Sequence, residues 1–220
     1  MRTLALIPLL LLMLGLLPSC GDEDTLSPAY TDYRYDLVTY LGRRGGGEAF
    51  EYLGRNDSVA VTLLSQDTLA GTLPHPGQRL LLRYLWADDR AGDTERAITL
   101  LGANAIVSDS LRLLGNEAGL LPRHAVKLRS LWRTGPYLNL HCQVEYTGEP
   151  RRMALTADST TLQTDTVDLW LVHDMGQSHT QFWRDCYASF YIGMLPCRAA
   201  RVWINDTVRP LTPCRILPLR

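Results

Sequence analysis

The sequence lacks the short motifs that mark common catalytic and nucleotide-binding sites. It contains no G-x-S-x-G nucleophile elbow, no H-E-x-x-H zinc motif, no P-loop and no G-x-G-x-x-G fingerprint. The triple glycine at 45–47 is not followed by Lys and Ser or Thr, so it predicts a hairpin turn instead of a phosphate cradle. We therefore expect a protein that is not an enzyme and that carries no cofactor.

The chain also lacks a large net charge of either sign. Its 22 Lys and Arg residues face 23 Asp and Glu residues, which leaves a formal net charge of -1. Such a chain has no bulk electrostatic attraction to nucleic acid or to an anionic membrane. We expect no nucleic-acid partner.

Long apolar runs are missing except at the N-terminus. One basic residue, Arg2, precedes the apolar stretch Leu4–Leu17, which is too short to span a bilayer core of about 30 Å. It fits the apolar region of a secretory signal peptide. The run ends in Leu17-Pro18-Ser19-Cys20, which resembles a bacterial lipobox. That resemblance implies that residues 1–19 are a lipoprotein signal peptide, that cleavage precedes Cys20, and that the Cys20 thiol is lipidated.

A lipidated Cys20 makes the membrane an expected partner. Each buried CH₂ group contributes about 0.8 kcal/mol, and two or more acyl chains, palmitate among them, anchor a protein stably. Residues 20–32 are polar and aperiodic, so they predict a flexible tether. Their acidic start, Gly21–Asp24, is similar to the surface-export signal of Bacteroidetes lipoproteins, although a solvated spacer has the same composition. We expect an outer-membrane lipoprotein and leave open whether it faces the periplasm or the outside.

Four cysteines follow Cys20 in a chain that we expect to be exported. Oxidising compartments permit disulfides, but four cysteines allow three complete pairings, and the sequence alone does not choose among them. None has the C-x-x-C spacing of zinc or redox sites. Cys142 shares an apolar strand face with Leu140 and Val144, which favours a buried free thiol. Any bridge is expected first among the other three, Cys186, Cys197 and Cys214.

The first half of the mature chain predicts strands separated by turns. Short apolar or alternating runs bounded by Gly, Asn and Asp are typical of strands. Five such runs within residues 33–108 predict a small OB-like barrel, partly open in the usual form. The runs are Tyr33–Leu41, Ala49–Leu53, Val59–Leu64, Gln78–Trp86 and Arg96–Val107.

Residues 109–122 contain several strand breakers and predict a linker, which is followed by a β-sandwich over residues 123–220. The stretch Gly176–Asp185 predicts a loop over one end of that sandwich. The fold class is therefore all-β, a barrel followed by a sandwich. The expected sandwich strands are Val126–Trp132, Tyr137–Tyr146, Arg152–Thr156, Thr166–His173, Tyr187–Leu195 and Arg201–Ile204.

This layout resembles the NigD-like lipoproteins of Bacteroidetes, which combine a lipobox, an N-terminal OB-type barrel and a C-terminal β-sandwich. The stretches that carry the resemblance are Pro76–Tyr84, Leu131–Leu140, Val167–Asp174 and Tyr187–Phe190. They are packing motifs. The resemblance therefore implies a fold and a cell-envelope location, and it brings no catalytic residues.

One candidate ligand site lies on the predicted barrel. OB folds bind oligonucleotides or oligosaccharides through stacked aromatic rings and basic side chains. Aromatic residues in strands are also common as core residues and cross-strand pairs, which is the alternative. The candidate residues are Tyr40, Phe50, Tyr52, Arg43, Arg44 and Arg55.

Two further clusters have competing interpretations. Trp132, Trp170, Trp183 and Trp203 could form a sugar platform, and Trp183 is expected to be the most exposed because it falls in the predicted loop. A loop could also gather several ligand-capable side chains around a divalent ion. We favour a strand end with a polar loop and predict no metal. The residues concerned are His173, Asp174, His179 and Asp185.

These features together predict a non-enzymatic envelope lipoprotein with a binding or assembly role and an envelope protein or glycan as partner. Two alternatives make different structural predictions. A surface module that binds carbohydrate or peptide requires an exposed aromatic cleft. An envelope hydrolase requires a pocket in which His and Asp side chains converge.

Overall fold

The computed structural model describes residues 33–55, 59–71, 74–87, 94–146, 151–176, 182–209 and 213–219. The expected signal peptide, Cys20 and the expected tether lie outside the described residues. Residues from Tyr33 onward belong to one unit. No helix in the described part of the chain is long and apolar enough to cross a membrane.

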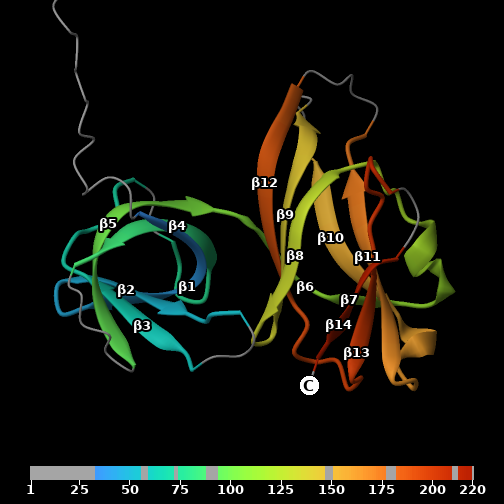
Figure 1. The fold of residues 1–220 in the computed structure, drawn as a ribbon, viewed down its shortest axis with the longest axis horizontal. Helices are drawn as coiled ribbons and strands as arrows, with labels where there is room; N and C mark the ends of the chain where they lie inside the picture. Colours follow the sequence, from blue (N-terminus) through green and yellow to red (C-terminus); the bar gives the residue numbers. More distant parts are fainter. Residues whose placement is uncertain are drawn as a thin grey trace, which may run out of the picture. The chain divides into compact units, whose positions relative to one another are not determined.

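The first half forms a five-stranded barrel, as the sequence predicts (Figure 1). The strand order is β1-β2-β3-β5-β4, and β1 pairs with β4 to close the ring. The barrel is therefore closed instead of partly open, which removes the unpaired edges that an open sheet exposes. β3 and β5 pair in parallel. The strands are β1 (Arg34–Arg44), β2 (Gly47–Tyr52), β3 (Val61–Ser65), β4 (Arg79–Trp86) and β5 (Glu95–Ala105).

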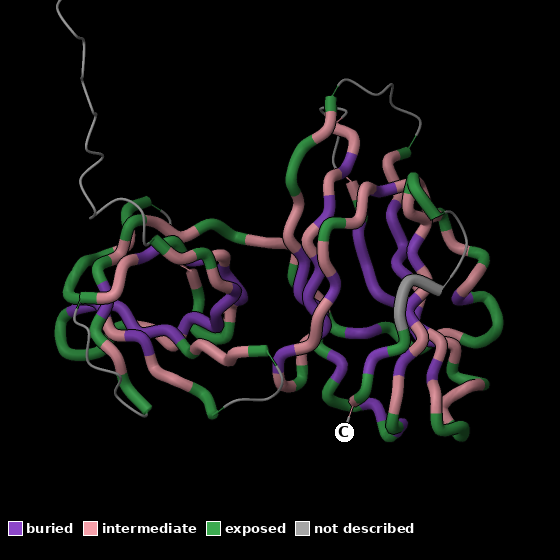
Figure 2. Tube along the Cα trace, viewed as in Figure 1, coloured by how far each residue is buried: buried purple, intermediate pink, exposed green. Residues whose placement is uncertain are grey.

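Alternate residues of these strands point inward, because successive side chains leave a strand on opposite faces. Figure 2 shows the resulting buried positions along the barrel strands. The interior is filled by side chains, so the barrel holds a packed core. That core comprises Val38, Tyr40, Phe50, Leu63, Leu80, Leu82, Tyr84 and Ile98.

The second half forms two sheets that pack face to face. One sheet has the order β6-β12-β9-β8, and the other has the order β14-β13-β11-β10-β7. Both contribute to one apolar core, with Leu138 and Leu140 from the first sheet and Leu155 and Leu169 from the second. This arrangement confirms the expected sandwich.

The first sheet comprises β6 (Val107–Ser110), β8 (Lys127–Thr134), β9 (Tyr137–Tyr146) and β12 (Phe182–Tyr191). The second comprises β7 (Arg112–Leu114), β10 (Arg152–Asp158), β11 (Thr166–Asp174), β13 (Ala199–Trp203) and β14 (Pro213–Pro218). Two short 3-10 turns, η3 (Asn116–Leu120) and η4 (Ser159–Thr161), complete the elements.

The segment 109–122, expected as a linker, contributes structure to the sandwich. β6 pairs in parallel with β12, and β7 pairs in parallel with β10. Leu111, between the two strands, is buried in the sandwich core, and Ala118 of η3 is also buried. The segment therefore supplies an edge strand to each sheet.

The expected loop Gly176–Asp185 ends earlier than the sequence indicates. Residues 177–181 lie outside the described residues, but β12 already begins at Phe182. Phe182 to Cys186 pair with Tyr146 to Cys142 of β9. Pairing with β9 therefore extends the strand into a stretch whose own sequence predicts a loop.

Candidate functional site

The outer face of the sheet β6-β12-β9-β8 carries an unusual set of polar side chains. Leu138, Leu140 and Ala188 point into the sandwich, so the residues between them point outward. An outward face of an antiparallel sheet commonly meets water. Here Asn139 and Ser189 are fully buried instead, although both lie on that face.

Arg79 of barrel strand β4 covers these two residues. Its side chain is only 3% exposed. Nε donates to Ser189 Oγ over 3.1 Å, and Nη2 donates to Asn139 Oδ1 over 3.3 Å. Nη1 donates to Thr39 Oγ1 over 3.1 Å within the barrel. Asn139 Nδ2 in turn donates to Thr134 Oγ1 over 2.7 Å. A buried polar network therefore joins the barrel to the sandwich.

The partners that accept hydrogen bonds from Arg79 are all uncharged. The guanidinium also lies 4.4 Å from the centre of the Tyr137 ring, whose face attracts a cation. Burial lowers the pKa of Arg79 to about 10. The group thus stays charged at neutral pH, and fixed dipoles and a ring face replace its water.

A cleft of about 480 Å³ lies beside this network and is lined by residues of both halves. The barrel side provides polar and aromatic groups from β1, β2 and the following turn, and the sandwich side provides them from β8, β9 and β12. Such a mixture of rings and convergent polar groups is typical of ligand sites. The aromatic and charged lining residues are Arg34, Tyr35, Asp36, Tyr52, Arg55, Trp132, His141 and Tyr187.

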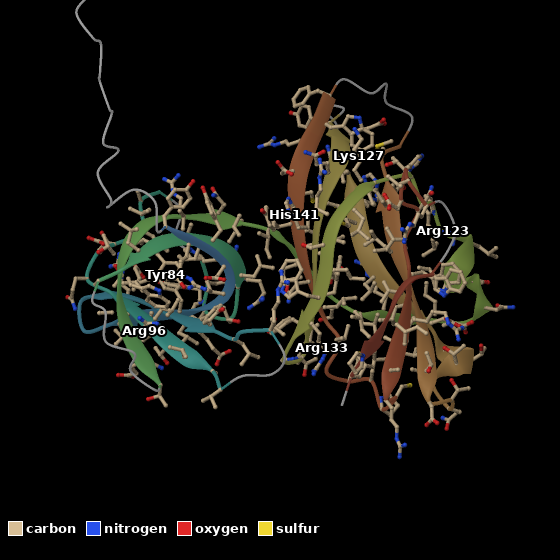
Figure 3. The ribbon with its side chains drawn as sticks, viewed as in Figure 1. Tyr84, Arg96, Arg123, Lys127, Arg133 and His141 are labelled. Carbon is tan, nitrogen blue, oxygen red and sulfur yellow. The ribbon has the colours of Figure 1, made fainter. Side chains whose placement is uncertain are left out.

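Two of the sandwich rings stack on each other beside the cleft. β12 places Tyr187 directly opposite His141 of β9, and the rings stack with centroids 4.2 Å apart and an interplanar angle of 6°. Figure 3 marks His141 on this sheet. Burial, then the nearby Asp185, raises the pKa of Tyr187, so its hydroxyl stays protonated at neutral pH.

Trp132 of β8 provides a second ring. The Arg55 guanidinium lies 5.2 Å from the Trp132 ring centre, which joins a barrel cation to a sandwich ring. Both residues line the cleft. Burial also raises the pKa of Tyr52, which faces the same space and therefore keeps its hydroxyl proton.

Asp36 is held in place on the barrel side. Tyr84 OH donates to Asp36 Oδ2 over 2.9 Å, and Arg34 Nε donates to the same oxygen over 3.2 Å. Tyr84 is fully buried in the barrel, where Figure 3 labels it. Burial and the Asp36 carboxylate raise the pKa of Tyr84. The carboxylate therefore has one permanent donor from the core and one from the surface.

The cleft also contains a histidine bound to a carboxylate. His141 Nε2 lies 3.1 Å from Asp185 Oδ1, and Ser130 of β8 stands opposite His141 in register. In the described part of the chain no hydrogen bond joins Ser130 to His141. The geometry thus holds a His–Asp pair without an aligned hydroxyl nucleophile.

The residues proposed from the sequence divide between core and cleft. Tyr40 and Phe50 lie inside the barrel, with 3% and 0% exposure. Neither ring is available to a ligand, because strand alternation turns both inward. Arg43 pairs with the buried Glu48 at 3.4 Å, and Arg44 is exposed at the hairpin end. Tyr40 and Phe50 therefore belong to the barrel core and do not form an exposed aromatic face.

Tyr52 and Arg55 line the cleft, as part of a different surface from the one expected. Trp183 lies in β12 instead of a loop and is half-buried, with Lys127 Nζ 3.9 Å from its ring centre. Trp170 and Trp203 stack on each other in the second sheet, with centroids 4.7 Å apart. The four tryptophans therefore do not gather on one platform.

Sequence reasoning missed Tyr35, His141 and Tyr187. Alternation places His141 opposite to the core residue Leu140 along β9, and it could have marked the polar face. The pairing of β9 with β12 that brings the two rings together has no signal in the sequence.

One of the four residues considered for a metal site, His179, lies outside the described residues. Among the described residues no group of three His, Cys, Asp or Glu side chains could hold a metal ion. His173 is buried and exchanges hydrogen bonds with His124, each ring Nδ1 meeting the other residue's carbonyl oxygen. Asp185 lies on the first sheet, away from His173, and its carboxylate is 3.1 Å from His141 Nε2 of the same sheet.

Known structures share this fold. A protein of unknown function from Bacteroides vulgatus superimposes with a TM-score of 0.66 at 13% identity, over 84% of this chain and 90% of that one. A NigD-like immunity protein from Bacteroides caccae gives 0.60 at 15%, over 85% and 97%. A predicted lipoprotein from Bacteroides fragilis gives 0.60 at 10%, over 86% and 99%. The fold thus resembles NigD-like proteins, as expected. No protein-family model matches the sequence, and no curated protein matches it.

Proposed function

We propose that this protein is a lipid-anchored, non-enzymatic lipoprotein of the bacterial outer membrane, with a binding role performed by the cleft between barrel and sandwich. One observation carries the binding role. A space of about 480 Å³ brings aromatic rings of two sheets together with the charged groups of Arg34, Asp36 and Arg55. The buried Arg79 network holds the two walls of that space in one arrangement.

The structural neighbours support the non-enzymatic part of the proposal. They include an immunity protein, a predicted lipoprotein and a protein of unknown function, and none of these descriptions names a reaction. The lipoprotein neighbour also agrees with an anchor at Cys20.

The chemistry of the cleft favours an oligosaccharide of the envelope or the surroundings. Flat rings such as the Tyr187–His141 stack and Trp132 offer faces to the apolar faces of sugar rings. Charged and hydroxyl groups beside them offer hydrogen bonds to sugar hydroxyls. OB-type barrels serve the same class of ligand with similar groups. A peptide is the competing ligand.

A binding screen tests the site. The mature protein is applied to arrays of bacterial glycans and of peptides, and hits are measured by titration. Trp132→Ala is expected to weaken glycan binding at least about tenfold, because central aromatic residues dominate binding energy. Trp183→Ala is the matched control: it removes another half-buried tryptophan of the same sheet outside the cleft, and binding should stay within about twofold. If Trp183→Ala weakens binding more than Trp132→Ala does, the binding site lies at Trp183 instead of in the cleft. If only peptides bind, the ligand is a peptide and not an oligosaccharide.

The anchor has its own test. Cys20→Ala should leave a protein that no longer partitions with membranes when cells are fractionated. Unchanged partitioning would refute the lipid anchor. Protease treatment of intact cells then separates the two faces of the membrane: loss of the protein without lysis places it outside, and protection places it in the periplasm.

The His141–Asp185 pair favours a second candidate, an envelope hydrolase. In that case the imidazole acts as a general base in the cleft. Wild-type protein would hydrolyse nitrophenyl esters or glycosides, and His141→Gln would lose at least about a hundredfold in rate. Absence of wild-type turnover discards this candidate.

A further inference from the structure

Two of the cysteines face each other across neighbouring strands. Cys186 of β12 is in register with Cys142 of β9, between the pairs Tyr187 with His141 and Asp185 with Gln143. Directly opposed residues of an antiparallel pair have Cα atoms about 4.5 to 5.5 Å apart. A disulfide needs Cα atoms about 4.4 to 6.8 Å apart. The backbone therefore already has the spacing of a bridge.

The two side chains also leave the sheet on the same face. Cys142 is fully buried in the sandwich core, and Cys186 packs against that core while partly exposed. Both thiols are free. The opposed positions in the ladder and the shared face bring the two side chains together in the sheet.

The surroundings favour the thiolate of Cys186. The hydrogen bond from the Cys142 thiol lowers the pKa of Cys186, and the charges of Arg151 and Arg184 act in the same direction against the effect of burial. Arg151 Nη1 is buried and has no hydrogen-bond partner among the described residues. A nearby positive charge favours the thiolate, which is the reactive form of cysteine.

We propose that Cys142 and Cys186 form a disulfide that links β9 to β12 once the chain reaches an oxidising compartment. This inference uses the envelope location of the proposed function and does not depend on the cleft. It also differs from the pairing expected from the sequence, in which Cys142 stays free and a bridge is sought among the C-terminal cysteines.

The oxidant is a protein disulfide of the thiol–disulfide oxidoreductase class. The Cys186 thiolate attacks one sulfur of that disulfide, and the other sulfur leaves as a thiolate. Cys142 then loses its proton, and its sulfur attacks the Cys186 sulfur of the mixed disulfide. The oxidoreductase leaves as a dithiol. Two electrons have passed to it, and one S–S bond has replaced two S–H bonds in this chain.

Cys197 is the built-in comparison. It is also buried in the sandwich core, where its Sγ donates to the carbonyl oxygen of Leu162 over 3.4 Å, and it lies outside the β9–β12 pair. Cys197→Ser therefore removes a buried thiol without touching the proposed bridge.

The experiment maps thiols in the full protein isolated from cell envelopes. The protein is denatured in acid, free thiols are blocked with N-ethylmaleimide, and bridged ones are reduced and labelled with iodoacetamide. Trypsin leaves Cys186 and Cys197 in one peptide, since no Lys or Arg lies between them. Chymotrypsin is therefore added to cut after Tyr187 or Phe190. Iodoacetamide on Cys142 and Cys186, and a linked peptide before reduction, support the bridge.

Maleimide on both residues, or a link from either to another cysteine, overturns it. Thermal unfolding provides the second readout: a reductant should lower the melting temperature of the wild type and of Cys197→Ser, but not of Cys142→Ser or Cys186→Ser. Oxidation of the reduced protein in glutathione buffer separates the two premises. A bridge that forms there but not in cells overturns the envelope location, and failure in both overturns the pairing.

Discussion

Arg79 of the barrel donates a hydrogen bond from Nε to Ser189 Oγ of the sandwich over 3.1 Å, with both residues buried. The same guanidinium reaches Asn139 of β9, so one side chain contacts two strands of the other half. The cleft lies beside this contact and takes its walls from both halves. The Arg79 side chain therefore joins the two halves that provide the walls of the proposed site.

Removal of the Arg79 guanidinium should destabilise the protein. Arg79→Met keeps much of the volume but leaves the oxygens of Ser189 and Thr39 without the donor that Arg79 supplies. It also removes one of the two donors to Asn139 Oδ1, and together these losses cost about 2 to 4 kcal/mol in the free energy of unfolding. Urea unfolding measures the change. Arg83→Met on the same strand is the control, because Arg83 is exposed, and its effect should stay within about 0.5 kcal/mol. Equal effects would contradict a special role for Arg79.

Glu48 should be a second sensitive position. This carboxylate is fully buried and accepts from Tyr40 OH over 2.6 Å and from the Leu69 backbone NH over 3.3 Å. Burial and Glu48 together raise the pKa of Tyr40 to about 12. Glu48→Ala leaves both donors unpaired and should cost about 2 to 3 kcal/mol. The exposed Glu51 of the same strand provides the control Glu51→Ala, expected within about 0.5 kcal/mol.

Gly47 at the start of β2 has no room for a side chain. A Cβ atom there would lie 1.7 Å from the Ser65 carbonyl oxygen of β3, which is backbone and cannot turn aside. Gly47→Ala should therefore lower the free energy of unfolding by about 1 to 3 kcal/mol. Gly102→Ala in β5 meets open space and should change it by less than about 1 kcal/mol in either direction. A harmless Gly47→Ala would mean that β2 and β3 are further apart than described.

His173 should make stability depend on pH. Burial lowers the pKa of His173, Arg151 and His124 lower it further, and the His124 carbonyl and Asp174 oppose them. The unfolded chain takes up a proton near pH 6.5, while the native imidazole stays neutral. The unfolded state thus binds more protons below that pH. The free energy of unfolding therefore decreases as the pH is lowered, by at most about 1.4 kcal/mol per pH unit.

Urea unfolding between pH 7 and pH 5 measures that slope. His173→Gln should flatten it relative to the wild type, whatever its effect on absolute stability. His75→Gln removes an exposed imidazole and should leave the slope unchanged. The prediction fails if the His173 and His75 variants have the same slope.

The fold was largely predictable because its strands announce themselves locally. The alternating run from Tyr33 and the glycines at 45–47 predict the first hairpin, and Gly45 and Gly46 do take positive φ at its turn. The three-residue strand β7 was missed because such a short run has no period to detect. It is ordered by pairing with β10, which lies far along the chain.

The cleft was less predictable, because its residues meet through register and packing between the two halves. The hairpin pairing places Tyr40 opposite Phe50, so the two side chains share a face of the sheet. Whether that face points into the barrel depends on the direction in which the sheet curves to close. Likewise His141 and Tyr187 are polar residues of two separate runs until β9 and β12 align. Of the barrel residues that the sequence predicts to bind a ligand, only Tyr52 and Arg55 line the cleft. The sequence places them on a face of the barrel alone and does not predict the cleft.

The parallel pairing of β6 with β12 also constrains the order in which the two halves fold during synthesis. Val107 pairs with Ala188, whereas every partner of the barrel strands lies before residue 106. Pairings between distant segments form late, and N-terminal units of a growing chain fold first. The barrel strands are therefore complete in the growing chain before most sandwich strands have emerged. β6 lacks its partner strand until the last third of the chain has emerged, and its unpaired edge is exposed during that interval.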